Sequence, residues 1–95
     1  MALEVKNVEG EHKKDIMIYA LSTCGWCRKT KNLLQDMGVA YNYIDVDMLQ
    51  GEDREEALAR MKEHNPSGGF PTIVIDGTDC IVGFNQDKIK EKLEI

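Results

Sequence analysis

The segment that decides the fold is residues 16–27, with the sequence IMIYALSTCGWC. Its first half, Ile16 to Leu21, is an unbroken apolar run, which is typical of a strand buried on both faces of a parallel or mixed sheet. From the second cysteine onward, apolar residues recur at helical spacing, and Gly38 is placed to end that helix. Ser22 and Thr23 are suited to cap its first turn. The two cysteines therefore fall where a buried strand gives way to a helix.

The chain beyond this helix continues to alternate between strand and helix patterns. The sequence predicts, in order, a strand at Tyr41 to Val46, a helix from Glu52 to His64, a strand at Thr72 to Ile75, a turn at residues 76–79, a strand at Cys80 to Val82 and a last helix capped by Asn85. These patterns predict an α/β fold in the order β-α-β-α-β-β-α. A four-stranded mixed sheet would be flanked by three helices.

The length of the chain, 95 residues, suits one hydrophobic core and one domain. Residues 15–95 carry all the elements named above. Residues 1–14 are polar and lack a sustained periodicity, so we expect them to form an N-terminal arm, with a short strand around Leu3 to Val5.

The composition excludes several classes of function. Twelve Lys and Arg against seventeen Asp and Glu give a net charge of −5, which argues against nucleic acid as a partner. No apolar run approaches the roughly 18 to 20 residues that a membrane span needs, so we expect no membrane association. The N-terminus does not have the pattern of a secretory signal, which favours a cytoplasmic location. In that reducing compartment a C-x-x-C pair favours redox or metal chemistry over a structural disulfide.

The predicted position of Cys24 favours nucleophilic chemistry. At a helix start its sulfur would face unpaired N–H groups and the positive end of the helix dipole. Cysteines so placed in C-x-x-C motifs have pKa values lowered from about 8.5 to roughly 3.5–7.5. Arg28, Lys29 and Lys31 add positive charge nearby. Cys27 lies one turn further on, within reach of a disulfide, and is the natural resolving thiol.

Metal chemistry is the alternative for the same cysteines. A structural zinc site ordinarily needs four ligands, and the chain has no second C-x-x-C, so we expect no zinc. An iron–sulfur cluster held by Cys24 would need ligands from a second chain and from added thiols. The third cysteine, Cys80, is interpreted as a small apolar residue of a strand. We expect a monomer without a tightly bound cofactor.

Three motifs together resemble one known family. The CGWC helix start, the Phe70-Pro71-Thr72 segment and the Gly83-Phe84 turn look like those of glutaredoxins in the thioredoxin superfamily. Among these the chain resembles small archaeal redoxins, including the coenzyme M-linked methanoredoxin group. The resemblance implies a thioredoxin-like fold. It also implies a cis-proline at Pro71 that faces the cysteines, with the backbone of Phe70 pairing to the bound substrate.

The chain also departs from the usual glutaredoxin pattern. Glutaredoxins commonly carry a basic residue shortly before the first cysteine to hold glutathione, whereas this chain has Leu21, Ser22 and Thr23 there. After the last strand it keeps one glycine, Gly83, and one candidate acid, Asp87. That turn resembles the redoxins that serve ribonucleotide reductase and take electrons from thioredoxin reductase.

These observations lead to one hypothesis and two alternatives. The hypothesis is a thiol–disulfide oxidoreductase that reduces protein disulfides with electrons from a low-molecular-weight thiol such as glutathione or coenzyme M. The alternatives are a donor to ribonucleotide reductase reduced by thioredoxin reductase, and an iron–sulfur carrier. Cys24 would be the nucleophile and Cys27 the resolving thiol. The residues expected to contact the thiol or the substrate are Trp26, Arg28, Phe70, Pro71, Gly83, Phe84 and Asp87.

Overall fold

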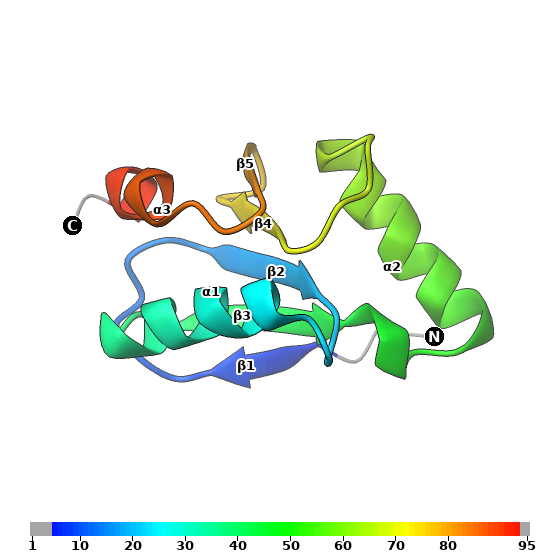
Figure 1. Ribbon diagram of the computed structural model, residues 1–95, viewed down its shortest axis with the longest axis horizontal. Coiled ribbons are helices and arrows are strands. Elements are labelled where there is room, and N and C mark those ends of the chain that lie inside the picture. Colours follow the sequence, from blue (N-terminus) through cyan, green and yellow to red (C-terminus); the bar gives the residue numbers. More distant parts are fainter. Residues whose placement is uncertain (1–4, 94–95) are drawn as a thin grey trace.

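The computed structural model describes residues 5–93, which form five strands, three α-helices and one short 3-10 helix (Figure 1). The elements are β1 (Lys6–Val8), β2 (Ile16–Ala20), α1 (Gly25–Asp36), β3 (Tyr41–Asp45), η1 (Val46–Met48), α2 (Gly51–His64), β4 (Thr72–Ile75), β5 (Asp79–Val82) and α3 (Gln86–Leu93). The predicted order is confirmed, with one additional strand at the start.

The strands form one mixed sheet in the order β1-β3-β2-β4-β5. β2 runs parallel to β3, and α1 is the crossover between them. β4 pairs antiparallel to β2 on its other side, so that Ile18 lies between Tyr43 of β3 and Ile73 of β4. β5 and β1 are the antiparallel edge strands. The segment that carries the cysteines therefore leaves the sheet from its central strand.

The two faces of the sheet are covered by different helices, as the buried clusters show. Ile16, Ile18 and Ala20 of β2 belong to the cluster that α1 and α3 cover. Tyr19, which lies between Ile18 and Ala20 and so points to the opposite face, belongs to the cluster that α2 covers. The prediction that this strand is buried on both faces is thus confirmed. In residues 5–93 no helix combines the length and the apolar character that crossing a membrane requires.

The described part of the N-terminal arm forms a strand at Lys6–Val8, which makes the sheet five-stranded instead of four-stranded. The strand predicted around Leu3 to Val5 falls mostly on residues 1–4. Residues 1–4 lie outside the described range. Lys6 and Asn7 are exposed, so burial gives this strand little support. Its stability comes from pairing with β3, and Glu11 extends the contact: its N–H donates to the Gly38 carbonyl at 2.7 Å, and its own carbonyl accepts from Ala40 at 2.9 Å.

Several predicted ends and turns are confirmed. Gly38 closes α1 with a φ of 69°, and the Asn85 side chain accepts a backbone N–H of the first turn of α3 at 3.1 Å. Asp76 and Gly77 both have positive φ, as a tight hairpin turn between β4 and β5 requires. β3 ends one residue earlier than predicted, because Val46 begins η1.

The close approach of the arm to α1 yields a stability prediction. A Cβ atom at Gly10 would lie 2.7 Å from the Gly38 carbonyl oxygen and 2.8 Å from backbone atoms of Val39 and Ala40. Gly10→Ala should therefore lower the free energy of unfolding by about 1–3 kcal/mol, measured by denaturant titration. Gly25→Ala is the control, because a Cβ there meets nothing within 4 Å. Equal stability of the two variants would contradict this account of the arm.

Candidate active site

Cys24 is the N-cap of α1. Its backbone is extended, with φ −82° and ψ 118°, and its Sγ accepts the backbone N–H of Cys27 at 3.2 Å. The prediction that Ser22 or Thr23 caps this helix is wrong. Both lie too early in the chain, because the helix begins directly after the first cysteine, whose sulfur takes the acceptor role that a hydroxyl usually fills.

Cys27 is the buried member of the pair. Its side chain has 0% exposure and shares the inner side of α1 with Thr30 and Leu34. Burial, followed by a side-chain hydrogen bond with Cys24, raises the pKa of the Cys27 thiol to about 12. Cys27 therefore keeps its proton at neutral pH, whereas Cys24 is only partly buried. The pair thus consists of a partly accessible sulfur, that of Cys24, and a buried, protonated thiol, that of Cys27.

A hydrogen-bonded pair fixes the turn just before the cysteines. The carboxylate of Asp47, in η1, accepts the backbone N–H of Ser22 at 2.8 Å and its hydroxyl at 2.5 Å. These two hydrogen bonds lower the pKa of the Asp47 carboxyl. Arg54 of α2 donates to the Asp47 carbonyl at 3.1 Å. Hydrogen bonds thereby connect the turn that leads into α1 with η1, and η1 with α2.

The three basic residues of α1 have three different environments. Lys31 forms an ion pair with Asp45 at 3.0 Å and lies 3.9 Å from the centre of the Tyr43 ring. Lys29 lies over Trp26 at 4.5 Å from its ring centre. Arg28 forms no ion pair with any residue in the described range. Of the three cations expected to add positive charge near Cys24, only Lys31 has an ion-pair partner within residues 5–93.

The aromatic residues predicted for the site form a surface beside the cysteines. Trp26 is 57% exposed and stacks on Phe84, with ring centres 5.9 Å apart. The Phe70–Pro71 peptide bond is cis, as the resemblance implied. The Pro71 carbonyl accepts the N–H of Gly83 at 2.8 Å, which joins the two loops that carry these residues. Phe70 packs against both buried clusters.

Two further residues of the sequence analysis lie in α3 and β5. Asp87 is exposed in the first turn of α3, where it suits the helix dipole. Cys80 is partly buried in β5, and burial raises the pKa of its thiol. Over residues 5–93, no three His, Cys, Asp or Glu side chains gather as a metal site would require.

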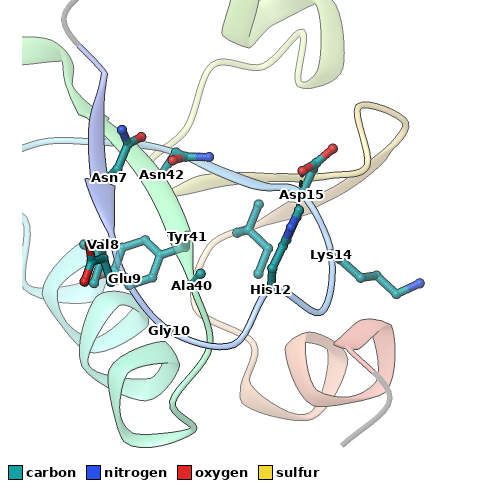
Figure 2. A pocket seen from close by; sticks show the side chains of 11 residues that line it. Asn7, Val8, Glu9, Gly10, His12, Lys14, Asp15, Ala40, Tyr41 and Asn42 are labelled. Atoms are coloured by element: carbon teal, nitrogen blue, oxygen red, sulfur yellow. Dashed lines mark hydrogen bonds and ion pairs between the residues drawn. The ribbon is translucent and has the colours of Figure 1, made fainter.

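Two of the cavities beside the sheet lie toward opposite ends of β2. One, of about 250 Å³, is lined by Cys24 and by residues of α1, β1 and β3. The other, of about 590 Å³, lies under the loop between β1 and β2 and includes Ile16, at the start of the strand. Figure 2 shows this second cavity, where His12 and Asp15 point toward each other at 2.9 Å. It includes no cysteine, so the chemistry of the C-x-x-C pair belongs to the smaller cavity.

Comparison with known proteins agrees with this geometry. The family model described as Glutaredoxin matches residues 16–80. The chain belongs to the glutaredoxin family. A glutaredoxin 1 from Rickettsia bellii is 42% identical over an alignment of 84 positions that covers 82% of this chain and 84% of the relative.

Solved structures of other glutaredoxin-type proteins share the whole fold. The crystal structure of the glutaredoxin from Methanosarcina mazei is 40% identical, with a TM-score of 0.89 over 99% of this chain and 98% of that one. That of the methanoredoxin from Methanosarcina acetivorans is 42% identical, with a TM-score of 0.87 over 90% of each chain. The resemblance to archaeal redoxins is thus confirmed.

Two features of this glutaredoxin site were missed in the sequence. Asp47 was one of several acidic residues in its region, and its partner Ser22 is 25 positions away. The Lys31–Asp45 pair with Tyr43 likewise joins α1 to β3. The signal that could have found both is the parallel β-α-β unit, which brings the carboxyl end of β3 beside the start of α1.

The burial of Cys27 predicts the order in which the thiols react. Iodoacetamide should modify Cys24 of the reduced protein first at pH 7, because Cys27 is covered and protonated. Since the pKa of Cys27 is raised to about 12, its modification should accelerate with every step of pH toward that value. Peptide mapping by mass spectrometry checks both statements. Modification of Cys27 at pH 7 as fast as that of Cys24 would refute this assignment.

The lowered pKa of Asp47 predicts a pH-dependent contribution to stability. A carboxyl whose pKa is lowered by folding stabilises the protein above its unfolded value of about 3.9, and this stabilisation is lost as the pH falls through the folded pKa. Asp47→Asn should therefore unfold at lower denaturant concentration than the unsubstituted protein at pH 7. The difference should shrink on acidification below pH 4. Asp36→Asn, at an exposed position of α1, is the matched control. A gap that stays constant with pH would count against the role of the carboxylate.

Proposed function

We propose that the protein is a thiol–disulfide oxidoreductase that reduces disulfides of other proteins with electrons from a low-molecular-weight thiol. The observation that carries this proposal is the N-cap geometry of Cys24, whose Sγ accepts the N–H of Cys27. An N–H donor and the positive end of a helix stabilise a thiolate more than a thiol. Membership of the glutaredoxin family supports the same chemistry.

The first half of the cycle uses both cysteines. The Cys24 thiolate attacks one sulfur of the substrate disulfide, so that a mixed disulfide forms and the other substrate sulfur leaves as a thiolate, which takes a proton from water. Cys27 then loses its proton and attacks Cys24. The Cys24–Cys27 disulfide forms and the second substrate thiol is released. Two electrons pass from the protein to the substrate.

The environment of Cys27 suits this sequence of steps. In the free dithiol, both the hydrogen bond and the charge of Cys24 raise the pKa of Cys27. Bonding of Cys24 to the substrate removes both effects, while the ammonium of Lys31 continues to favour the Cys27 thiolate. Cys27 would therefore stay protected until the mixed disulfide exists, and would lose its proton more readily afterwards.

The second half of the cycle restores the dithiol. A small thiolate attacks Cys24 of the protein disulfide and releases the Cys27 thiolate, which takes a proton. A second small thiolate attacks the resulting mixed disulfide, so a small disulfide leaves and the Cys24 thiolate returns. No tightly bound cofactor takes part in this cycle. The cycle needs a supply of reduced small thiols, as in a reducing compartment such as the cytoplasm. One chain, acting as a monomer, supplies both cysteines.

The surface next to Cys24 suits a peptide substrate. Trp26 and Phe84 would cover the apolar side chains that flank the substrate disulfide. The backbone of Phe70 would pair with the substrate chain, and the Gly83 N–H, which donates to the Pro71 carbonyl, would hold that loop in place. Asp87 would meet a basic or amino group at the edge of the surface.

Cysteine variants test the proposal in an insulin reduction assay. Cys24→Ser should lose all reduction, because it removes the nucleophile. Cys27→Ser should lose dithiol turnover and accumulate a mixed disulfide at Cys24, visible by mass spectrometry. Cys80→Ser is the matched control and should retain the rate of the unsubstituted protein. Reduction by Cys24→Ser at that rate would refute the proposal.

The electron donor is tested by reducing the oxidised protein with glutathione, with coenzyme M and with a thioredoxin reductase system in parallel. The proposal expects a small thiol to be fastest. A faster reaction with thioredoxin reductase would favour the donor to ribonucleotide reductase. Visible absorption and stoichiometric iron in anaerobically purified protein would instead favour the iron–sulfur carrier.

A further inference from the structure

We propose that Asn65 and Thr72 are positioning residues, which hold the loop of residues 68–71 in the conformation that lets the backbone of Phe70 pair with a protein substrate. This inference rests on the proposed function and adds to it the residues that favour protein disulfides over small disulfides. Asn65 is the C-cap of α2 and Thr72 is the first residue of β4, so the two stand at the ends of the loop (Figure 1).

A buried network of side-chain hydrogen bonds joins the two ends of this loop. Thr72 is fully buried, and Asn65 is 4% exposed. The Asn65 side-chain amide donates to the Thr72 hydroxyl at 3.0 Å, and this hydroxyl donates to the Gly69 carbonyl at 2.6 Å. The hydroxyl of Ser67 donates to the side-chain carbonyl of Asn65 at 2.7 Å. Because buried polar groups are costly to leave without partners, the network fixes the loop relative to α2 and β4.

The backbone in turn holds both ends of the network. Thr72 lies inside the sheet, paired with β2 on one side and with β5 on the other. The N–H of Asn65 donates to the Met61 carbonyl at 2.9 Å, which joins it to the last turn of α2. Its backbone carbonyl accepts the N–H of Gly68 at 3.0 Å. The loop is therefore held between the sheet and the end of α2.

The hydrogen bonds of this loop leave the backbone of Phe70 available to a partner. The Gly69 carbonyl accepts from Thr72, and the Pro71 carbonyl accepts from Gly83. Within residues 5–93, neither the N–H nor the carbonyl of Phe70 has a hydrogen-bond partner. A free donor and a free acceptor on one residue of a fixed loop are what an extended peptide needs in order to pair with it. A small disulfide has no peptide backbone, so its reaction should not depend on the network.

The test compares a protein disulfide with a small one as oxidants of the reduced protein. The protein, freed of reductant, is mixed with excess insulin or bis(2-hydroxyethyl) disulfide, and mass spectrometry of quenched samples follows the loss of the dithiol form. Thr72→Val keeps the shape of the side chain and removes the hydroxyl. It should lower the second-order rate constant for insulin about tenfold, as the loss of two hydrogen bonds predicts, and change that for the small disulfide less than about twofold. The fall should come from a higher half-saturating insulin concentration at an unchanged limiting rate.

Thr72→Ser is the matched control, because it keeps the hydroxyl and should keep the ratio of the two rate constants seen in the unsubstituted protein. Gly10→Ala controls for a loss of stability alone, since Gly10 lies between β1 and β2, outside the network, and its substitution should also leave the ratio unchanged. Ser67→Ala, at an exposed position, removes the outer hydrogen bond of the network and should lower the ratio about threefold.

The outcomes that would overturn the assignment are distinct. They are an unchanged ratio in Thr72→Val, or in Ser67→Ala where Thr72→Val does not fold, an equal fall for both disulfides, and a loss in Thr72→Ser or Gly10→Ala as large as that in Thr72→Val. Failure of the proposed function would look different, because the unsubstituted protein would then reduce neither disulfide.

Amide hydrogen exchange gives a readout without turnover. The N–H of Gly83 donates to the Pro71 carbonyl at 2.8 Å and so reports on the loop, whereas the N–H of Gly38 donates to the Gln35 carbonyl at 3.0 Å at the far end of α1. In Thr72→Val, exchange at Gly83 should accelerate while exchange at Gly38 stays unchanged, because local opening exposes only the loop. Equal acceleration at both amides, or none at Gly83, would contradict the positioning role.

Discussion

The hydrogen bond from the Cys27 N–H to the Cys24 sulfur is the interaction on which the chemistry of this fold depends. It exists because β2 is buried on both faces and leaves the sheet at a fixed point, so α1 must begin directly after Cys24. The same turn of helix carries the Cys27 side chain into the core. One cysteine therefore points to the surface with an N–H donor beside it, and the other is stored as a covered thiol. Helix geometry and burial thus give two chemically identical residues different surroundings, from which we expect different reactivity.

The residues around the start of α1 differ in chemical character on the two sides of Cys24. Asp47 binds both polar groups of Ser22 and so fixes the approach to Cys24 from the far side of the sheet. This carboxylate therefore orders a turn, residues 21–23, that carries no charged side chain of its own. On one side of Cys24 the stacked Trp26 and Phe84 form an apolar surface. On the other, Arg28, which has no ion pair within residues 5–93, lines the cavity of about 250 Å³ beside Cys24.

The sequence was sufficient for the elements whose stability comes from burial or local backbone preference. The apolar run of β2, the stop of α1 at Gly38 and the C-x-x-C pair at the helix start all belong to this class. β1 was not predicted at Lys6–Val8, because these mostly exposed residues carry no periodicity and the strand is held by pairing with the edge of β3. The helix cap was assigned to a hydroxyl because propensity favours Ser and Thr, although the strand end decides which residue precedes the helix. Asp47 could not be found because its hydrogen bonds connect residues far apart in sequence.

The central claim is that Cys24 and Cys27 form the working pair and that Cys80 takes no part. The most direct measurement is disulfide mapping of the reduced protein after oxidation with one equivalent of a small disulfide. This account predicts a single intramolecular bond between Cys24 and Cys27, in a monomer whose Cys80 remains free for alkylation. A bond that includes Cys80, whether within one chain or between two, would contradict it.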